Sequence, residues 1–176
     1  LVSICNPTRR IGRESTEDRV EKIWIKHYSP GVPAEVDTSR YANLIELIET
    51  ACKKHATKPA YKMMGASQSF AQIDEASRAL AAYLQSLGLA KGDRVAIMMP
   101  NIFQYPVAIA AVLRAGYVAV NVNPLYTPRE LEHQLKDSGA KAIVIVENFL
   151  PTLKEVYEKV PTKHVILASI GDMFGF

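Results

Sequence analysis

The second half of the chain alternates short, continuously apolar runs with stretches in which apolar residues recur at helical spacing. The apolar runs have the length of buried strands, and they predict strands at 94–99, 117–122, 141–146 and 164–168. The intervening patterns predict helices at 102–115, 127–139 and 149–159. Strands that are apolar throughout and alternate with helices are typical of a parallel sheet covered on both faces. The predicted fold class is therefore α/β, with a doubly wound, mostly parallel sheet flanked by helices.

The first half of the chain predicts an N-terminal helix and a β-hairpin that precede this sheet. Residues 23–33 favour an extended segment entering a Pro-Gly turn, and apolar spacing predicts a helix at about 41–55. Residues 60–64 and 67–70 flank Gly65-Ala66 as two hairpin strands would. Ser69 followed by Gln72 is a capping-box pattern that begins a helix ending near Leu87. The expected buried stripe of that helix is Ile73, Ala76, Leu80, Tyr83, Leu84 and Leu87.

Length and composition suit one globular domain with a short appendage. The 176 residues are 48% hydrophobic and 22% charged, which is ordinary for a globular protein. Residues 1–20 show no sustained periodicity, and we expect a disordered or non-native tail there, followed by the domain at 21–176. The chain starts at Leu1 without an initiator Met, which leads us to expect a fragment or a wrongly assigned start.

Charge, cysteine content and hydropathy exclude several classes of protein. A net charge of +3 with interspersed signs argues against a nucleic-acid partner. Two scattered cysteines, Cys5 and Cys52, do not form a disulfide framework and fit a reducing cytoplasm, with Cys52 expected in the core. No apolar run reaches the ~18–20 residues that span a bilayer. The scattered histidines have no zinc-ligand spacing, so no metal site is expected.

The loops after the predicted strands are the places to look for chemistry, because open parallel sheets bind ligands beyond the carboxyl ends of their strands. Asn101 follows the first strand and is expected to cap the next helix. The glycine motifs of dinucleotide and P-loop sites are absent, as is a nucleophile elbow. The second loop combines Asn123, Tyr126 and Thr127 at a helix start, which suits either a turn with a cap or an anion site. Met63-Met64 and Met98-Met99 are expected to fill the core.

The stretch from Gly92 to Val146 carries a resemblance to a known family. It contains Gly-Asp-Arg-Val, then Met-Pro-Asn, then Arg-Ala-Gly, then Asn-Pro-Leu-Tyr-Thr-Pro-Arg-Glu-Leu, and Ser69-Phe70-Ala71-Gln72 precedes them. In this order the segments resemble long-chain fatty acid–CoA ligases, the acyl-CoA synthetases of the adenylate-forming superfamily. The resemblance implies that residues 21–176 are a truncated N-terminal part of the AMP-binding domain of such an enzyme.

What the resemblance implies for function concerns the full-length enzyme. That enzyme would use ATP, CoA and Mg²⁺ to convert a long-chain fatty acid first to an acyl-adenylate and then to an acyl-CoA. The family's phosphate loop and catalytic lysine lie downstream, so no catalytic residue, bound cofactor or activity is expected in this fragment. Asn123, Tyr126 and Thr127 are the candidates for substrate binding or for shaping the subdomain boundary. A cytoplasmic location, peripheral attachment to the inner membrane face and a homodimer are all compatible with the resemblance.

Two alternatives remain open at this stage. The chain could be a non-enzymatic α/β binding or regulatory module on the same scaffold. It could also come from a fatty acyl-AMP ligase or a ligase for shorter acids, because chain-length choice is made in a pocket that these residues do not encode.

Overall fold

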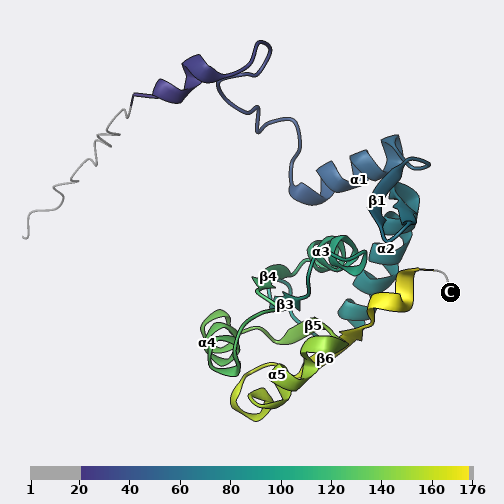
Figure 1. Ribbon diagram of the computed structural model, residues 1–176, viewed down its shortest axis with the longest axis vertical. Helices are drawn as coiled ribbons and strands as arrows, with labels where there is room; N and C mark the ends of the chain where they lie inside the picture. The colour runs from purple at the N-terminus through teal and green to yellow at the C-terminus, as the bar shows by residue number, and fades with distance from the viewer. Residues whose placement is uncertain (1–20, 175–176) are drawn as a thin grey trace, which may run out of the picture. The chain divides into compact units, whose positions relative to one another are not determined.

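The computed structural model describes residues 21–174 (Figure 1), and the chain divides into two compact units, the first ending at Thr38 and the second beginning at Ser39. In the first unit, Ile23–His27 forms a 3₁₀ helix, η1, and the Lys22 ammonium lies 2.7 Å from the Glu35 carboxylate. The extended conformation expected at the start of 23–33 is therefore wrong. A bond from Tyr28 N–H to the Ile25 carbonyl closes a helical turn there. The tail expected at 1–20 lies outside the described residues.

The second unit is built on a parallel sheet whose strands all fall within the predicted apolar runs. In the described chain its spatial order is β4-β3-β5-β6, and every neighbouring pair is parallel. All five residues of β5 are buried, which explains why its sequence shows no alternation. The strands are β3 (Arg94–Met98), β4 (Val118–Val122), β5 (Ala142–Val146) and β6 (His164–Ala168).

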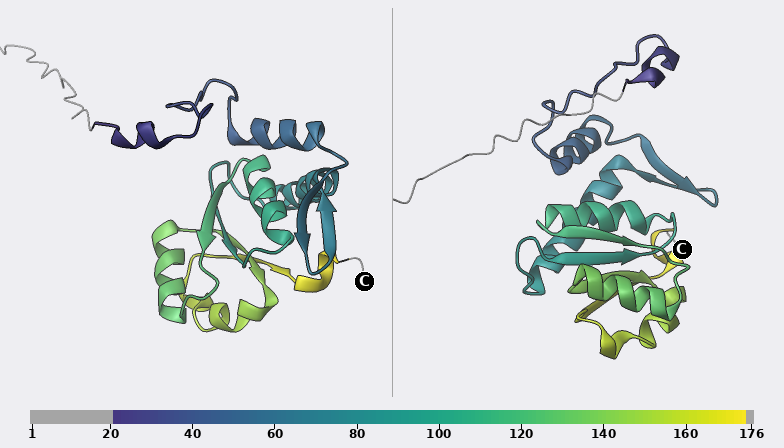
Figure 2. Two further views of the ribbon diagram at one scale, coloured as in Figure 1. Left: turned by 45° about the horizontal axis from the view of Figure 1, so that its top comes forward. Right: turned by 90° about the vertical axis from the view of Figure 1, so that its left-hand side faces the viewer.

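Helices cover both faces of the sheet, as the two further views show (Figure 2). On one face Val95 and Ile97 of β3 share a core with α2 (Phe70–Ser86) and α3 (Gln104–Arg114). On the other face Ala96 and Met98 share a second core with α4 (Pro128–Ser138) and α5 (Leu150–Lys154). Alternate residues of one strand thus enter different cores. The doubly wound α/β fold predicted from the sequence is confirmed.

The N-terminal helix and the hairpin precede the sheet, as expected. Helix α1 spans Leu44–Lys54, and the antiparallel strands are β1 (Pro59–Met63) and β2 (Ala66–Ser69). The turn consists of Met64 and Gly65, one residue earlier than Gly65-Ala66, and both have positive φ (49° and 81°). This pattern belongs to type I′ hairpin turns. Met64 is consequently 85% exposed, so its expected place in the core is wrong.

The buried face of α2 differs from the predicted stripe. Helix α2 buries Ile73, Ser77, Ala81 and Leu84, whereas Tyr83 is exposed. The small side chains of that face let α2 approach α3 closely.

The helix expected at 149–159 is broken into short pieces: η2 (Glu147–Phe149), α5 and η3 (Tyr157–Lys159). Tight bonds from Val156 N–H to the Leu153 carbonyl and from Lys159 N–H to the Val156 carbonyl replace α-helical ones. Leu153 and Val156 both enter the second core, which the tighter winding allows.

Candidate functional site

The carboxyl ends of β3, β4, β5 and β6 lie at one edge of the parallel sheet, because these four strands run in the same direction. The chain leaves β3 toward β4 on one side, and β5 later pairs with β3 on the other side. The carboxyl ends of β3 and β5 therefore mark the topological switch point, where open α/β sheets place their ligand crevice. Four loops, after β3, β4, β5 and β6, supply the side chains at this edge.

The loop after β4 holds all three candidate residues from the sequence. The Asn123 side-chain oxygen accepts a bond from Leu125 N–H at 3.0 Å, and the Asn123 carbonyl accepts one from Tyr126 N–H at 3.1 Å. Asn123 and Thr127 are exposed, whereas Tyr126 packs against the second core. Asn123 thus forms the turn and Tyr126 anchors it. The role of the three residues in substrate binding or at a subdomain boundary stays a prediction.

Thr127 and Glu130 form the capping box that begins α4. The Glu130 carboxylate accepts bonds from Thr127 N–H at 2.9 Å and from the Thr127 hydroxyl at 2.8 Å. These bonds stabilise the ionised carboxylate and lower the pKa of Glu130, the backbone bond having the larger effect. A carboxylate already occupies this helix start, which argues against a second anion there.

The loop after β3 is organised differently from the expectation. Asn101 does not cap the next helix: α3 has Phe103 at its N-cap position, without a side-chain bond to the helix. Ile102 N–H bonds to the Pro100 carbonyl and Tyr105 N–H to the Ile102 carbonyl, so a tight turn delays the helix. Phe103 is 2% exposed, and its burial selects this turn over the Asn101 cap.

Gln104, the first residue of α3, is a site residue that the sequence reasoning missed. Its side-chain nitrogen donates to the Ser169 carbonyl at 2.6 Å, after β6. Gln104 is only 8% exposed and lies on a helix that is otherwise almost entirely apolar. A polar residue within an apolar stripe was the available signal, since buried amides require partners.

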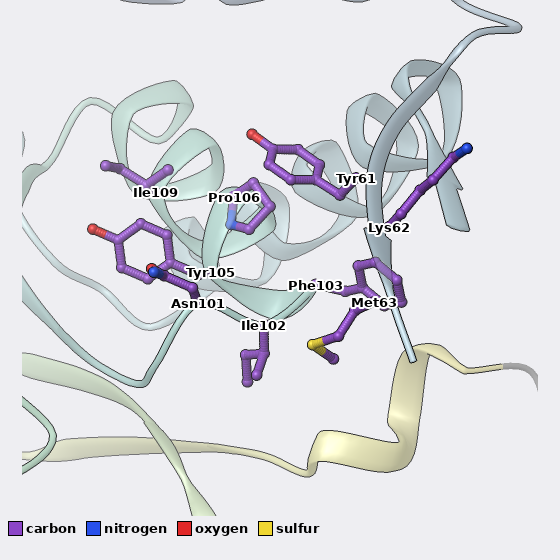
Figure 3. Close-up of a pocket in the computed structure, with 9 residues that line it drawn as sticks. All are labelled: Tyr61, Lys62, Met63, Asn101, Ile102, Phe103, Tyr105, Pro106 and Ile109. Atoms are coloured by element: carbon purple, nitrogen blue, oxygen red, sulfur yellow. The ribbon is translucent and has the colours of Figure 1, made fainter. Parts of the chain in front are cut away.

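An apolar pocket of about 330 Å³ lies between the hairpin and the start of α3 (Figure 3). Asn101 is one of its lining residues, and the Lys62 side chain points away from the others in this view. Rings and aliphatic groups dominate the lining, so the pocket suits an apolar group and has no acid–base pair for catalysis. Its walls include Tyr61, Met63, Ile102, Phe103, Tyr105 and Pro106.

A cluster of charged side chains joins three helices of the second unit. The Arg114 guanidinium at the end of α3 donates to Glu49 of α1 and to Asp74 of α2. Arg78 of α2 also pairs with both carboxylates, at 3.6 Å and 3.0 Å. Two cations and two anions neutralise each other, so the cluster suits a role in holding the helices together.

The described part of the chain shows neither a metal-binding cluster nor a membrane-spanning helix. Between residues 21 and 174, His, Cys, Asp and Glu side chains do not gather in groups of three or more that would hold a metal ion. In the same range the helices are too short or too polar to cross a membrane. Cys52 is buried as expected, and burial raises the pKa of its thiol.

Comparisons with known proteins agree with the geometry. The family model described as AMP-binding enzyme matches residues 48–174. A long-chain-fatty-acid–CoA ligase of Yersinia pestis is 59% identical over 154 residues, covering 87% of this chain and 27% of that protein. One from Haemophilus influenzae is 52% identical over 158 residues, covering 89% and 28%.

A solved structure supports the fold independently. The crystal structure of a long-chain-fatty-acid–CoA ligase from Archaeoglobus fulgidus superposes with a TM-score of 0.65 at 30% identity, covering 71% of this chain and 27% of that one. The chain spans about a quarter of the length of the curated relatives named above. Since the family model matches most of its residues, the chain belongs to the AMP-binding enzyme family.

Proposed function

We propose that this chain is part of a long-chain fatty acid–CoA ligase. The observation that carries the proposal is the 59% identity to a ligase of that name over 154 residues. The family model's match at 48–174 spans all four strands of the parallel sheet and the capped loop after β4. Proteins this similar over such a length share the scaffold on which their sites are built, although the scaffold alone does not dictate chemistry.

The proposed reaction has two steps. The fatty acid carboxylate attacks the α-phosphate of ATP, which forms a mixed anhydride with AMP and releases pyrophosphate. The CoA thiolate then attacks the acyl carbon and releases AMP. Mg²⁺ would offset the phosphate charge in the first step, but residues 21–174 offer no cluster suited to hold it.

Within this scheme the described residues serve as scaffold and boundary. The sheet fixes the loops at its carboxyl edge, and Asn123, Tyr126 and Thr127 shape the loop after β4. We assign them to the boundary with the rest of the enzyme because Tyr126 is anchored while Asn123 and Thr127 stay exposed. No residue of this chain is assigned a catalytic role.

The test compares two polypeptides in an ATP–pyrophosphate exchange assay. The full natural protein should exchange label from pyrophosphate into ATP only when palmitate is present, and should form palmitoyl-CoA when CoA is added. The isolated 176 residues should give no exchange above background. Fatty-acid-dependent exchange by the isolated residues would contradict the scaffold assignment. Exchange by the full protein with benzoate but not palmitate would contradict the substrate class.

A further inference from the structure

The switch point between β3 and β5 is covered by the chain's own residues. The segment Ser169–Phe174, here called the strap, follows β6 and contains the short helix η4 (Ile170–Met173). At one side the Ser169 carbonyl accepts a bond from Gln104, which follows β3. At the other side the Ser169 hydroxyl donates to the Glu147 carboxylate at 2.7 Å, and Glu147 follows β5 directly. The strap therefore bridges the carboxyl ends of both strands.

The far end of the strap is held as firmly as its beginning. The Gln68 side-chain nitrogen of β2 donates to the Met173 carbonyl at 2.6 Å. The rings of Phe103 and Phe174 lie with centroids 5.4 Å apart and planes tilted by 48°. Within the strap, Ser169 and Asp172 form a capping box. In the view of Figure 3 the ribbon of this segment lies below Phe103 and Met63.

Burial removes the Gln104 amide from water, and among the described residues only the strap provides hydrogen-bond partners for it. Its nitrogen bonds to the Ser169 carbonyl, with the Ile170 carbonyl at 3.4 Å, while its oxygen has no hydrogen-bond partner within residues 21–174. Burying half of an amide without a partner is unfavourable, and an apolar side chain of similar shape would avoid this cost. A glutamine differs from such an apolar side chain in its hydrogen bond to the strap, and this bond is the contribution that only the glutamine makes.

We propose that Gln104 and Gln68 are positioning residues that hold the strap across the β3/β5 switch point and keep this crevice closed. Ligands of the protein consequently bind outside this crevice, although the sheet order would place them in it. The proposal concerns this chain's own residues and holds whichever acid is activated.

The test is hydrogen exchange measured by mass spectrometry on the full natural protein. Gln104→Met and Gln68→Met each remove one strap bond while keeping the side chain's length. Peptides covering 169–174 should exchange about three- to tenfold faster in each variant, the size expected for one lost hydrogen bond. The melting temperature of Gln104→Met should change little, because the variant also removes the orphan oxygen.

The matched control is Gln134→Met. Gln134 also donates its amide to a main-chain carbonyl, that of Asn121 at 3.0 Å, and also has a buried oxygen without a partner in the described chain. It lies on α4, away from the strap contacts, so exchange at 169–174 should stay at the wild-type rate.

Two outcomes would overturn the proposal. The first is an unchanged exchange rate at 169–174 in both strap variants. The second is protection of the loop at 147–149, which does not line the pocket beside the hairpin, when MgATP or palmitate is added to the wild-type protein, since this would show a ligand in the crevice. The ligase assay is a separate readout, so failure of the strap proposal and failure of the proposed function are distinguishable.

Discussion

The guanidinium of Arg114 donates a hydrogen bond to the carboxylate of Asp74, which joins the end of α3 to the first half of α2. The Arg114 side chain is 6% exposed, so this contact is largely shielded from solvent. Glu49 of α1 accepts from the same guanidinium. One buried cation thereby links three helices, and its charge requires both carboxylates because an unpaired buried charge is strongly unfavourable.

We expect Asp74→Asn to lower the free energy of unfolding by about 1–3 kcal/mol, because a charged hydrogen-bond partner of a buried group is lost. The loss should persist in 1 M NaCl, since salt screens buried pairs weakly. Urea denaturation at low and high salt measures both. Lys136→Met breaks the exposed Glu132–Lys136 pair and should leave stability nearly unchanged. An effect of Asp74→Asn as small as that of the control would show that the cluster contributes little.

The capping boxes of α2 and α4 predict different responses to pH. Both contain the two reciprocal bonds of a capping box, but the third helical residue is Gln72 in α2 and Glu130 in α4. The folded-state pKa of Glu130 is lowered by its bonds to Thr127. Its stabilising effect is therefore complete above the unfolded pKa of about 4.3 and is lost as the pH falls through the folded value.

Urea unfolding of wild type and Glu130→Gln between pH 7 and pH 3 tests this. The wild type should be the more stable protein at pH 7, and the difference should shrink as the pH falls through the lowered folded-state pKa of Glu130. Gln72→Glu should introduce the same pH dependence at α2. A stability difference that is constant over this pH range would contradict the role of the Glu130 charge.

The hairpin turn predicts a stabilising substitution. Met64 has a φ of 49° and its side chain is 85% exposed, so it is strained in the left-handed region without a packing contribution to offset the strain. Met64→Asn should raise the free energy of unfolding by about 0.5–1 kcal/mol, because Asn tolerates this conformation and Asn-Gly favours type I′ turns. Met64→Leu retains the strain and should be neutral. Equal stability of the Asn and Leu variants in thermal unfolding would refute the prediction.

The strands could be predicted from the sequence because burial on both faces leaves a continuous apolar run, as in β5. The buried face of a helix could not be predicted in the same way. Tyr83 and Ser77 lie on neighbouring stripes of α2, and only the close packing against α3 decides that the small serine is inside. The break in the helix after β5 could not be predicted from the local sequence either, because the spacing of Leu153 and Val156 fits both α and 3₁₀ winding.

The candidate site likewise has a part that the sequence predicts and a part that depends on tertiary contacts. Asn123, Tyr126 and Thr127 are neighbours in sequence, so one loop brings them together without any tertiary information. Gln104 meets Ser169, and Gln68 meets Met173, only because the sheet and hairpin bring distant segments together. A single glutamine has no spacing pattern that predicts such a partner.

The position of β3 inside the sheet has a consequence for synthesis on the ribosome. Its first neighbour, β4, follows after one helix, but its second neighbour, β5, begins only at Ala142. Until that residue has left the exit tunnel, one side of β3 offers open main-chain groups to any nascent strand nearby. Rare codons placed between Val122 and Ala142 would lengthen that period, so we expect them to reduce the yield of folded protein.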